Sequence, residues 1–492
     1  MNLALPWLPP FAALPLLLAL GAGAADIPQA PVPKSPYIPI VYRYADTMLQ
    51  HGRDTFGPVP TGLFLSALDR ATLKPLTNAP PAPGGIRPGD RVGREHLIGA
   101  NPQHDQNLLR LLYLLHGLSG RAVYQEAAEA ELRWFLENSR SASTDLLPWG
   151  EHMSWNALTD EPHPREETAV HEFFRPWLLW DRCFALAPEA SRKFALGLWN
   201  HQIADHKTGA FDRHAGYWKH AAYSENDFPR HGGFFIRTWA VAYAHTRDGS
   251  FTNAIANLLD RFETGRHPAT GLIPSRRGHE IAWPASNLSL AIDCDGAAHG
   301  VPEPLASRLR ALAAREDDLF SRLAHPLKQG GGFFTAVQAA SGTADDPPTP
   351  LWEARYGGYT TAQVGMMLVS RYDNTGKPAC RDLMLAAADA YSDSLPDAQA
   401  DVWPGTAGQA ISLQLAAWRH TANPAYMQQA RRLADWTLEH LWDTHPLPRA
   451  STRSDHYETL TGADTLALSL VELHLQILAI TAVRCPPNTV DR

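Results

Sequence analysis

Histidine, arginine and aromatic residues are concentrated in residues 149–237 of this chain. Eight of the 22 histidines lie between residues 152 and 231, interleaved with tryptophan and phenylalanine. Imidazole changes its charge near neutral pH and can transfer protons, and arginine pairs with carboxylates. The stretch therefore predicts a cleft that binds a ringed, acidic ligand and moves protons. The alternative is a helical surface that is merely rich in histidine, but such a surface would carry many lysines and this stretch has three.

The candidate residues stand in the loops and at the helix ends that the pattern predicts. The candidates for catalysis are His152, His171, Arg175, His214, Tyr217, Arg230 and His231. The candidates for substrate binding are Asn101, His104, Trp149, Asn156, Glu172, Asn200, His201, Arg213, Arg237, Tyr243 and Tyr359. Asp105 is favoured as a helix cap over a catalytic group. In a ring of helix hairpins, four of these residues should converge on one cavity: His152, His171, His214 and Arg230.

A helix is predicted over residues 166–186, and it would place His171 and Arg175 on one face. Pro176 should kink this helix because it removes a backbone hydrogen bond. A buried ion pair between Glu172 and Arg175 is an equally weighted alternative to a role in the site. At residue 230 another helix begins with Arg-His, and a helix N-terminus with these side chains suits an anion.

The sequence predicts no resident cofactor, and it leaves a divalent metal open as an alternative. Four residues, His104, His152, His171 and Glu172, could bind one together, although no two of the histidines have i, i+4 spacing. No GxGxxG, GxxxxGK[ST], GxSxG or HExxH motif is present. Nucleotide binding, phosphoryl transfer and serine or zinc hydrolysis therefore lack their usual motifs.

The 492 residues carry a net charge of -8, which argues against a nucleic-acid partner. Local arginine and histidine side chains must then hold any anionic ligand. The four cysteines are widely spaced without a CxxC, so disulfides are possible but not needed at this size.

The chain divides into four parts. Residues 1–25 resemble an export signal, since an apolar run precedes Ala22-Gly23-Ala24, although no Lys or Arg stands before that run. The run is too short for a membrane span. A Pro-rich lead-in follows at 26–38, then a single catalytic domain at 39–484 and a tail at 485–492. The protein is expected to be exported, to the periplasm or outside the cell.

Apolar periodicity predicts fourteen helices and almost no strands. The predicted helices are 41–52, 103–119, 121–138, 166–186, 188–205, 230–247, 249–264, 283–299, 302–324, 357–373, 376–394, 405–421, 423–443 and 460–482. A weak repeat, in which a tight turn is followed by an aromatic residue near a helix start, pairs them into hairpins. The expected fold is all-α, an (α/α) toroid of six or seven antiparallel hairpins, with seven favoured. The irregular segment 57–100 is long enough to cover a site.

Four motifs carry a resemblance to a known group of proteins. They are the runs 101–105 (NPQHD), 149–152 (WGEH), 171–177 (HEFFRPW) and 230–234 (RHGGF). With them, residues from about 40 to 480 resemble exported bacterial pectate-lyase-like proteins and the (α/α) toroid polysaccharide lyases, of which family 38 acts on glucuronan and alginate. The resemblance implies β-elimination of a uronic-acid polymer such as glucuronan, alginate or pectate. In toroid lyases Asn and His commonly neutralise the carboxylate and Tyr is the acid or base, and Asn200, His201, Tyr217 and Tyr243 are present.

The chemistry itself sets the same requirements. The C5 proton of a uronate becomes removable when its carboxylate is neutralised and a base, Tyr or His, is near. Two other classes stay open: another carbohydrate-active toroid, a glycoside hydrolase or sugar epimerase, and a non-catalytic glycan-binding scaffold. A hydrolase would need two carboxylates about 5–10 Å apart.

Overall fold

The computed structural model describes residues 35–92, 97–166, 169–173, 176–220, 226–329, 331–397 and 399–488. Residues 35–492 form one compact unit. The predicted export signal, and all of the lead-in up to residue 34, lie outside the described residues. No described helix has both the length and the apolar character that crossing a membrane requires.

The described residues contain fourteen α-helices, one for each predicted helix. Their bounds are α1 (Tyr37–His51), α2 (Pro102–Ser119), α3 (Ala122–Asn138), α4 (Trp180–Leu186), α5 (Pro188–Gly197), α6 (Pro229–Thr246), α7 (Gly249–Thr264), α8 (Pro284–Ala298), α9 (Leu305–Arg322), α10 (Thr361–Thr375), α11 (Pro378–Asp389), α12 (Pro404–Thr421), α13 (Pro424–Thr437) and α14 (Ala463–Ile477). Half of them begin with proline, which suits the first helical position because no hydrogen bond is lost there.

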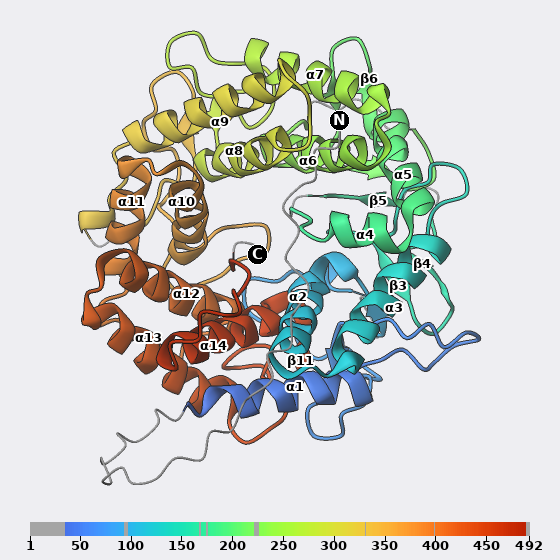
Figure 1. The fold of residues 1–492 in the computed structure, drawn as a ribbon, viewed down its shortest axis with the longest axis vertical. Coiled ribbons are helices and arrows are strands. Elements are labelled where there is room, and N and C mark those ends of the chain that lie inside the picture. The colour runs from blue at the N-terminus through green and yellow to red at the C-terminus, as the bar shows by residue number, and fades with distance from the viewer. Residues whose placement is uncertain are drawn as a thin grey trace, which may run out of the picture. The chain divides into compact units, whose positions relative to one another are not determined.

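The helices form a ring of seven pairs. The even-numbered helices lie on the inside and each packs against the odd-numbered helix that follows it, as Figure 1 shows. Helix α14 packs against α1, so the last helix and the first close the ring. The predicted (α/α) toroid is therefore confirmed, with seven pairs.

Tight links turn the chain from an inner helix to its outer partner. In four of them the first linking residue is in the left-handed region: Gly120, Arg247, Gly376 and Ala422, with φ of 70°, 60°, 67° and 56°. This conformation ends a helix by satisfying its last carbonyl groups. The aromatic residues of the predicted repeat are buried at the starts of the outer helices: Tyr124, Phe251 and Tyr426.

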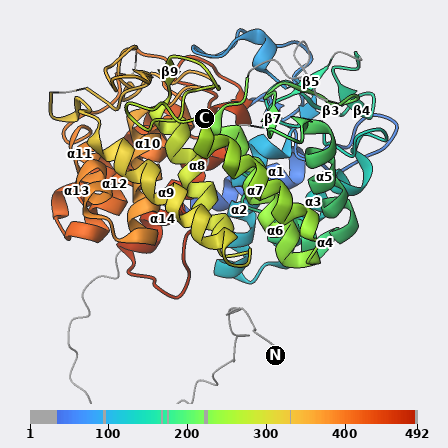
Figure 2. The ribbon, with the colours of Figure 1, turned by 90° about the horizontal axis from the view of Figure 1, so that it is seen from above.

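The long connections between pairs lie together on the opposite face and carry short strands, as Figure 2 shows for several of them. The strands, all of two or three residues, are β1 (Ala67–Leu68), β2 (Gly99–Ala100), β3 (Ser154–Asn156), β4 (Glu161–His163), β5 (Val170–His171), β6 (Ile203–Asp205), β7 (Ala210–Phe211), β8 (Ala215–Gly216), β9 (Ile281–Ala282), β10 (Val337–Gln338) and β11 (Tyr457–Glu458). They pair as β1–β11, β2–β3–β4, β5–β8, β6–β7 and β9–β10, all antiparallel. Every inner helix begins at this face, so its N-terminus points toward these connections.

The prediction of a helix over 166–186 is wrong for its first part, because α4 begins only at Trp180. The described residues form β5 at Val170–His171 and no helix at residues 172–173 or 176–179, and Pro176 cannot supply the N–H that a helix interior needs. The carbonyl of Pro176 instead accepts a hydrogen bond from the Gln106 side chain at 2.8 Å. His171 therefore lies in a strand and not on a helical face, and Arg175 lies outside the described residues.

The chain beyond α14 returns into the ring. The Asn488 side chain is buried and donates to Ser469 Oγ at 2.8 Å and to the Thr465 carbonyl at 3.1 Å. The Pro487 carbonyl accepts from Arg110 at 2.7 Å. The domain thus extends past residue 484, where a tail was expected to begin. All four cysteines, Cys183, Cys294, Cys380 and Cys485, are free thiols.

Candidate active site

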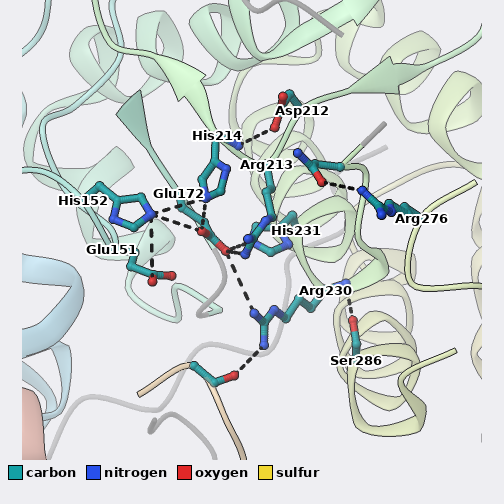
Figure 3. A network of polar contacts seen from close by, with 12 residues as sticks. Glu151, His152, Glu172, Asp212, Arg213, His214, Arg230, His231, Arg276 and Ser286 are labelled. Carbon is teal, nitrogen blue, oxygen red and sulfur yellow. Dashed lines mark hydrogen bonds and ion pairs between the residues drawn. The ribbon is translucent and has the colours of Figure 1, made fainter. Parts of the chain in front are cut away.

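Glu172 lies at the centre of a cluster of histidine and arginine side chains (Figure 3). Its carboxylate is fully buried. Oxygen Oε1 lies 2.7 Å from Arg213 Nη1 and 2.8 Å from His231 Nε2. Oxygen Oε2 lies 2.9 Å from His214 Nε2 and 3.6 Å from His152 Nε2. One buried anion therefore organises four side chains, which come from two connections between helices and from the first turn of α6.

Backbone contacts fix Glu172 and its partners in place. Glu172 directly follows β5, and Arg213 and His214 directly precede β8. The pairing of β5 with β8 therefore brings Arg213 and His214 beside Glu172. The loop that carries His152 packs on Glu172 through Gly150, whose φ is 93°. A Cβ atom at Gly150 would lie 2.2 Å from the Glu172 carbonyl oxygen, and the Glu151 amide donates to this oxygen at 3.0 Å. Only glycine combines this conformation with so close an approach.

Asn101 and His104 support this loop from beneath. The buried Asn101 amide donates to the carbonyl groups of Gly150, at 2.7 Å, and Met153, at 3.1 Å, and lies 3.3 Å from His104 Nε2. Asn101 and His104 were predicted to bind substrate. Both side chains are at most 2% exposed, so they position the loop and do not face a substrate. The predicted cap Asp105 lies inside α2, where burial raises its pKa well above its usual value, and Asn101 occupies the N-cap position.

The N-terminus of α6 contributes Arg230 and His231. The Arg230 guanidinium is buried, with Nη2 4.0 Å from Glu172 Oε1 and Nη1 donating to the Gly357 carbonyl at 3.2 Å. It also hydrogen-bonds to Tyr359 and lies 5.8 Å from the centre of the Trp283 ring. Arg230 is therefore held in one orientation by groups from three connections.

The protonation states follow from burial and from these contacts. Burial by itself raises the pKa of Glu172, but hydrogen bonds from three histidine rings outweigh it and hold that pKa well below its usual value. Burial lowers the pKa of His231 to about 4, so this ring is neutral at pH 7. Burial also lowers the pKa of Arg230, but Tyr359 and Glu172 raise it by more, so the guanidinium remains a cation. The cluster thus contains an ionised carboxylate beneath fixed positive charges.

An open cleft of about 410 Å³ lies next to this cluster. It is lined by Gly85, Arg87, Glu151, Arg213, Arg230, Trp283, Arg355, Tyr356 and Gly357. Four of these nine residues are arginines and one is a carboxylic acid. Trp283 stacks on Phe228 with ring centres 4.7 Å apart, which gives the cleft an aromatic wall. The lining suits an anionic ligand with flat, apolar ring faces.

Three side chains of the cluster have the spacing of metal ligands. His152 Nε2, His214 Nε2 and Glu172 Oε2 lie 2.9 to 3.6 Å from one another. Ligand atoms about 2.0–2.2 Å from a divalent ion stand about 3 Å apart, so the spacing of this donor set fits a divalent ion with three protein ligands. His104 was expected from the sequence as a possible metal ligand, but it is not part of this group. His214, which was not expected as a ligand, is part of it.

Two predicted site residues belong to the core. Trp149 is 1% exposed and packs against Trp177 and Phe194, with ring centres at 4.8 and 5.6 Å. Tyr217 is also 1% exposed, and its hydroxyl donates to the Ser139 carbonyl at 2.7 Å. Neither lines the cleft, because large aromatic side chains in these connections fill the space between the helices.

Five more predicted residues lie away from the cleft. The Asn156 side chain accepts backbone amides in the turn between β3 and β4. Asn200 is exposed and His201 lies beside another histidine, with ring centres 6.1 Å apart. Arg237 and Tyr243 lie about 10 and 20 Å along α6 from its first turn, since a helix rises 1.5 Å per residue. Arg175 and the side chain of His171 lie outside the described residues.

The structure also brings in residues that were not predicted as site residues. Trp283 and Arg355 come from connections far along the chain, and Arg87 lies in the irregular segment 57–100, which was expected to cover a site. Tyr356 stands three residues before Tyr359, which was predicted to bind substrate. Glu151 precedes His152, and this adjacency was the signal that could have identified it.

Comparison with known proteins places the same region in context. Residues 90–273 match the family model of periplasmic pectate lyases, and they include Glu172 and the side chains around it: His152, Arg213, His214, Arg230 and His231. The chain is 27% identical over 187 residues to a pectate disaccharide-lyase of Dickeya dadantii, covering 37% of this chain and 33% of that protein. The chain thus spans about a third of this relative's length. The expected resemblance to exported pectate-lyase-like proteins is confirmed, whereas polysaccharide lyase family 38 is not singled out.

Solved structures similar to this chain include an α-1,6-mannanase from Salegentibacter, with 9% identity and a TM-score of 0.45, over 90% of this chain and 99% of that one. A cellobiose 2-epimerase from Bacillus thermoamylovorans has 9% identity and a TM-score of 0.45, over 88% of this chain and 99% of that one.

Proposed function

We propose that the protein is a lyase that cleaves an acidic polysaccharide of the pectate type by β-elimination. The observation that carries the proposal is the arginine-lined cleft beside the buried Glu172 cluster. The match of residues 90–273 to periplasmic pectate lyases supports it. A protein with a net charge of -8 has no general attraction for a polyanion, so these local cations bind the substrate.

Arg213 and Arg230 are placed to bind the carboxylate of the uronate that reacts. Neutralising this carboxylate acidifies the neighbouring C5 proton and stabilises the enolate-like form. The aromatic wall at Trp283 packs on a sugar ring and orients it. His152, Glu172 and His214 would hold a divalent ion, which when bound supplies Lewis-acid polarisation of the same carboxylate.

Proton transfer at C5 falls to a group at the cleft surface. His231 is fully buried and hydrogen-bonded to Glu172, and His152 and His214 direct their ring nitrogens toward the proposed ion. Two lining residues remain as candidates, Arg213 through its guanidinium and Tyr356 through its phenol. Free guanidinium and phenol groups lose a proton only at alkaline pH, so a base of either kind should make turnover rise from pH 7 toward about pH 10. A histidine base would instead give a plateau above about pH 7.

A glycoside hydrolase is the second candidate, and the geometry disfavours it. Hydrolysis needs two carboxyl groups about 5–10 Å apart that face the sugar. Glu151 is the one carboxylic acid among the nine residues that line the cleft. Glu172 is covered by its partners, and Asp227 is paired with Arg261. A sugar epimerase, the other alternative, would not need four arginines at its site.

The periplasmic family match also supports export, and we place the enzyme outside the cytoplasm. The direct test is to incubate the protein with polygalacturonate, glucuronan and alginate in the presence of Ca²⁺ or Mn²⁺. β-Elimination creates a C4–C5 double bond that absorbs in the near ultraviolet, and we expect the largest signal with polygalacturonate. Reducing ends released without this absorbance would show a hydrolase. Binding without release of any product would show a glycan-binding scaffold.

A further inference from the structure

One wall of the cleft is built from two loops that are fastened to each other. The Tyr356 amide donates to the Gly85 carbonyl at 3.0 Å. Gly85 has a φ of 87°, and a Cβ atom there would lie 2.2 Å from the Ala354 carbonyl oxygen. The loops therefore touch backbone to backbone, and they place Arg87 and Arg355 on the same cleft.

The helix α12 anchors this wall to the ring. Trp403, at its N-cap, donates through Nε1 to the Gly84 carbonyl at 2.9 Å, and the Asp401 carboxylate accepts from the Gly84 amide. A small apolar cluster beneath the two loops joins them to the helices: Ile86, Ala354, Trp403 and Leu460. These contacts fix the backbone of the wall, so the side chains of its arginines extend from defined backbone positions.

The four arginines of the cleft differ in how their charge is balanced. Arg213 is paired with Glu172, and Arg87 is paired with Asp90 at 2.7 Å and Glu151 at 3.2 Å. Arg355 is exposed on the cleft, and its side chain makes no ion pair or hydrogen bond with the described part of the chain. Among the described residues Arg355 is therefore a cation without a counter-charge, and it borders the cleft in which Arg213 and Arg230 are proposed to bind a carboxylate.

We propose that Arg355 forms a second carboxylate-binding position, which recognises the uronate next to the one that is cleaved. This inference rests on the proposed function of the cleft. Its consequence is specificity for runs of free uronates, because a methyl ester on the neighbouring sugar removes the charge that Arg355 pairs with. Arg87 and Arg355 lie outside residues 90–273, which match the family model, so the family match does not extend to this wall.

The experiment compares the wild type with Arg355→Ala and Arg355→Lys on polygalacturonate and on highly methyl-esterified pectin, with near-ultraviolet absorbance as the readout. On polygalacturonate, Arg355→Ala should raise KM about five- to tenfold with kcat within twofold, since a contact worth about 1.4 kcal/mol is tenfold. Arg355→Lys should restore most of the affinity. High salt should shrink the difference, because the contact is exposed.

The esterified substrate and a control variant separate recognition from structural damage. On methyl-esterified pectin, Arg355→Ala and the wild type should differ by less than twofold. Arg43→Ala, which removes an exposed arginine on the outer helix α1, should behave as the wild type on both substrates. A KM on polygalacturonate that is unchanged in Arg355→Ala, or an equal loss on both substrates, would overturn the second position and leave the lyase function standing. A wild type that makes no unsaturated product would overturn the proposed function and this inference with it.

Discussion

Replacing Arg230 by alanine tests the centre of the proposed mechanism. The substitution removes a guanidinium that is 4% exposed and is held by the Gly357 carbonyl and Tyr359. The start of α6 should persist, because the backbone amide of residue 230 still donates to Ser286 Oγ at 3.1 Å. Glu172 keeps its closer partners, so the carboxylate remains compensated. The loss should therefore fall on the substrate and not on the fold.

The magnitude follows from the contact that is lost. A charge-assisted hydrogen bond to a carboxylate is worth about 1.5–3 kcal/mol, which corresponds to about 10- to 150-fold in rate. Because the contact strengthens as the enolate forms, kcat should fall by at least tenfold and not only KM rise. Arg230→Lys keeps the charge but loses the planar guanidinium, so its kcat should lie between those of the wild type and Arg230→Ala.

The assay is steady-state formation of unsaturated product from polygalacturonate, with thermal unfolding to check that each variant is folded. Lys328→Ala, an exposed residue that does not line the cleft, is the control and should retain wild-type kinetics. An Arg230→Ala variant that is folded and turns over at the wild-type rate would refute the reasoning, since the reacting carboxylate would then be held elsewhere.

Three further predictions concern the cluster and the fold. Chelation, or His214→Ala, should reduce activity by about 100-fold or more, because His214 would supply one of the three ligands of the proposed divalent ion. The variant should also lose Mn²⁺ binding in calorimetry. Full activity in excess chelator would contradict the proposed metal site. Gly150→Ala should lower the free energy of unfolding by more than about 2 kcal/mol. Gly120 is also at positive φ, but no atom lies near the position of its Cβ, so Gly120→Ala should cost only about 1–2 kcal/mol. Equal losses of the two variants in urea unfolding would contradict this. Burial lowers the pKa of His231 and of His325 to about 4, below the usual 6.5 that they regain on unfolding, so the unfolded chain binds more protons between these values. The free energy of unfolding should therefore fall as pH drops from 6.5 to 4, by up to about 3 kcal/mol for each ring, and urea midpoints that do not change over this range would contradict the assignment.

The sequence by itself predicted the ring of helices, for a physical reason. Each helix carries its own apolar stripe, and proline starts and left-handed ends are local features that need no distant partner. The prediction failed where distant pairing replaced local preference. Residues 166–179 have helical periodicity, but β5 finds a partner in β8 and Pro176 cannot continue a helix.

The sequence predicted which residue types form the site, whereas the tertiary structure determined how they are arranged. Residue type marked His152, His214 and Arg230 as chemically capable, and all three lie around Glu172. Residue type could not show which side chains point into the cleft and which fill the core, so Trp149 and Tyr217 were misplaced.

The far wall of the cleft depends entirely on closure of the ring. Arg87 and Arg355 stand 268 residues apart and meet only because the long connections share one face of the toroid. Gly85 permits the close approach, but the contact itself is a hydrogen bond between a backbone carbonyl and a backbone amide, so the local sequence of one loop does not specify the other. The sequence determined which elements form, and packing of the seven pairs determined which charges come together.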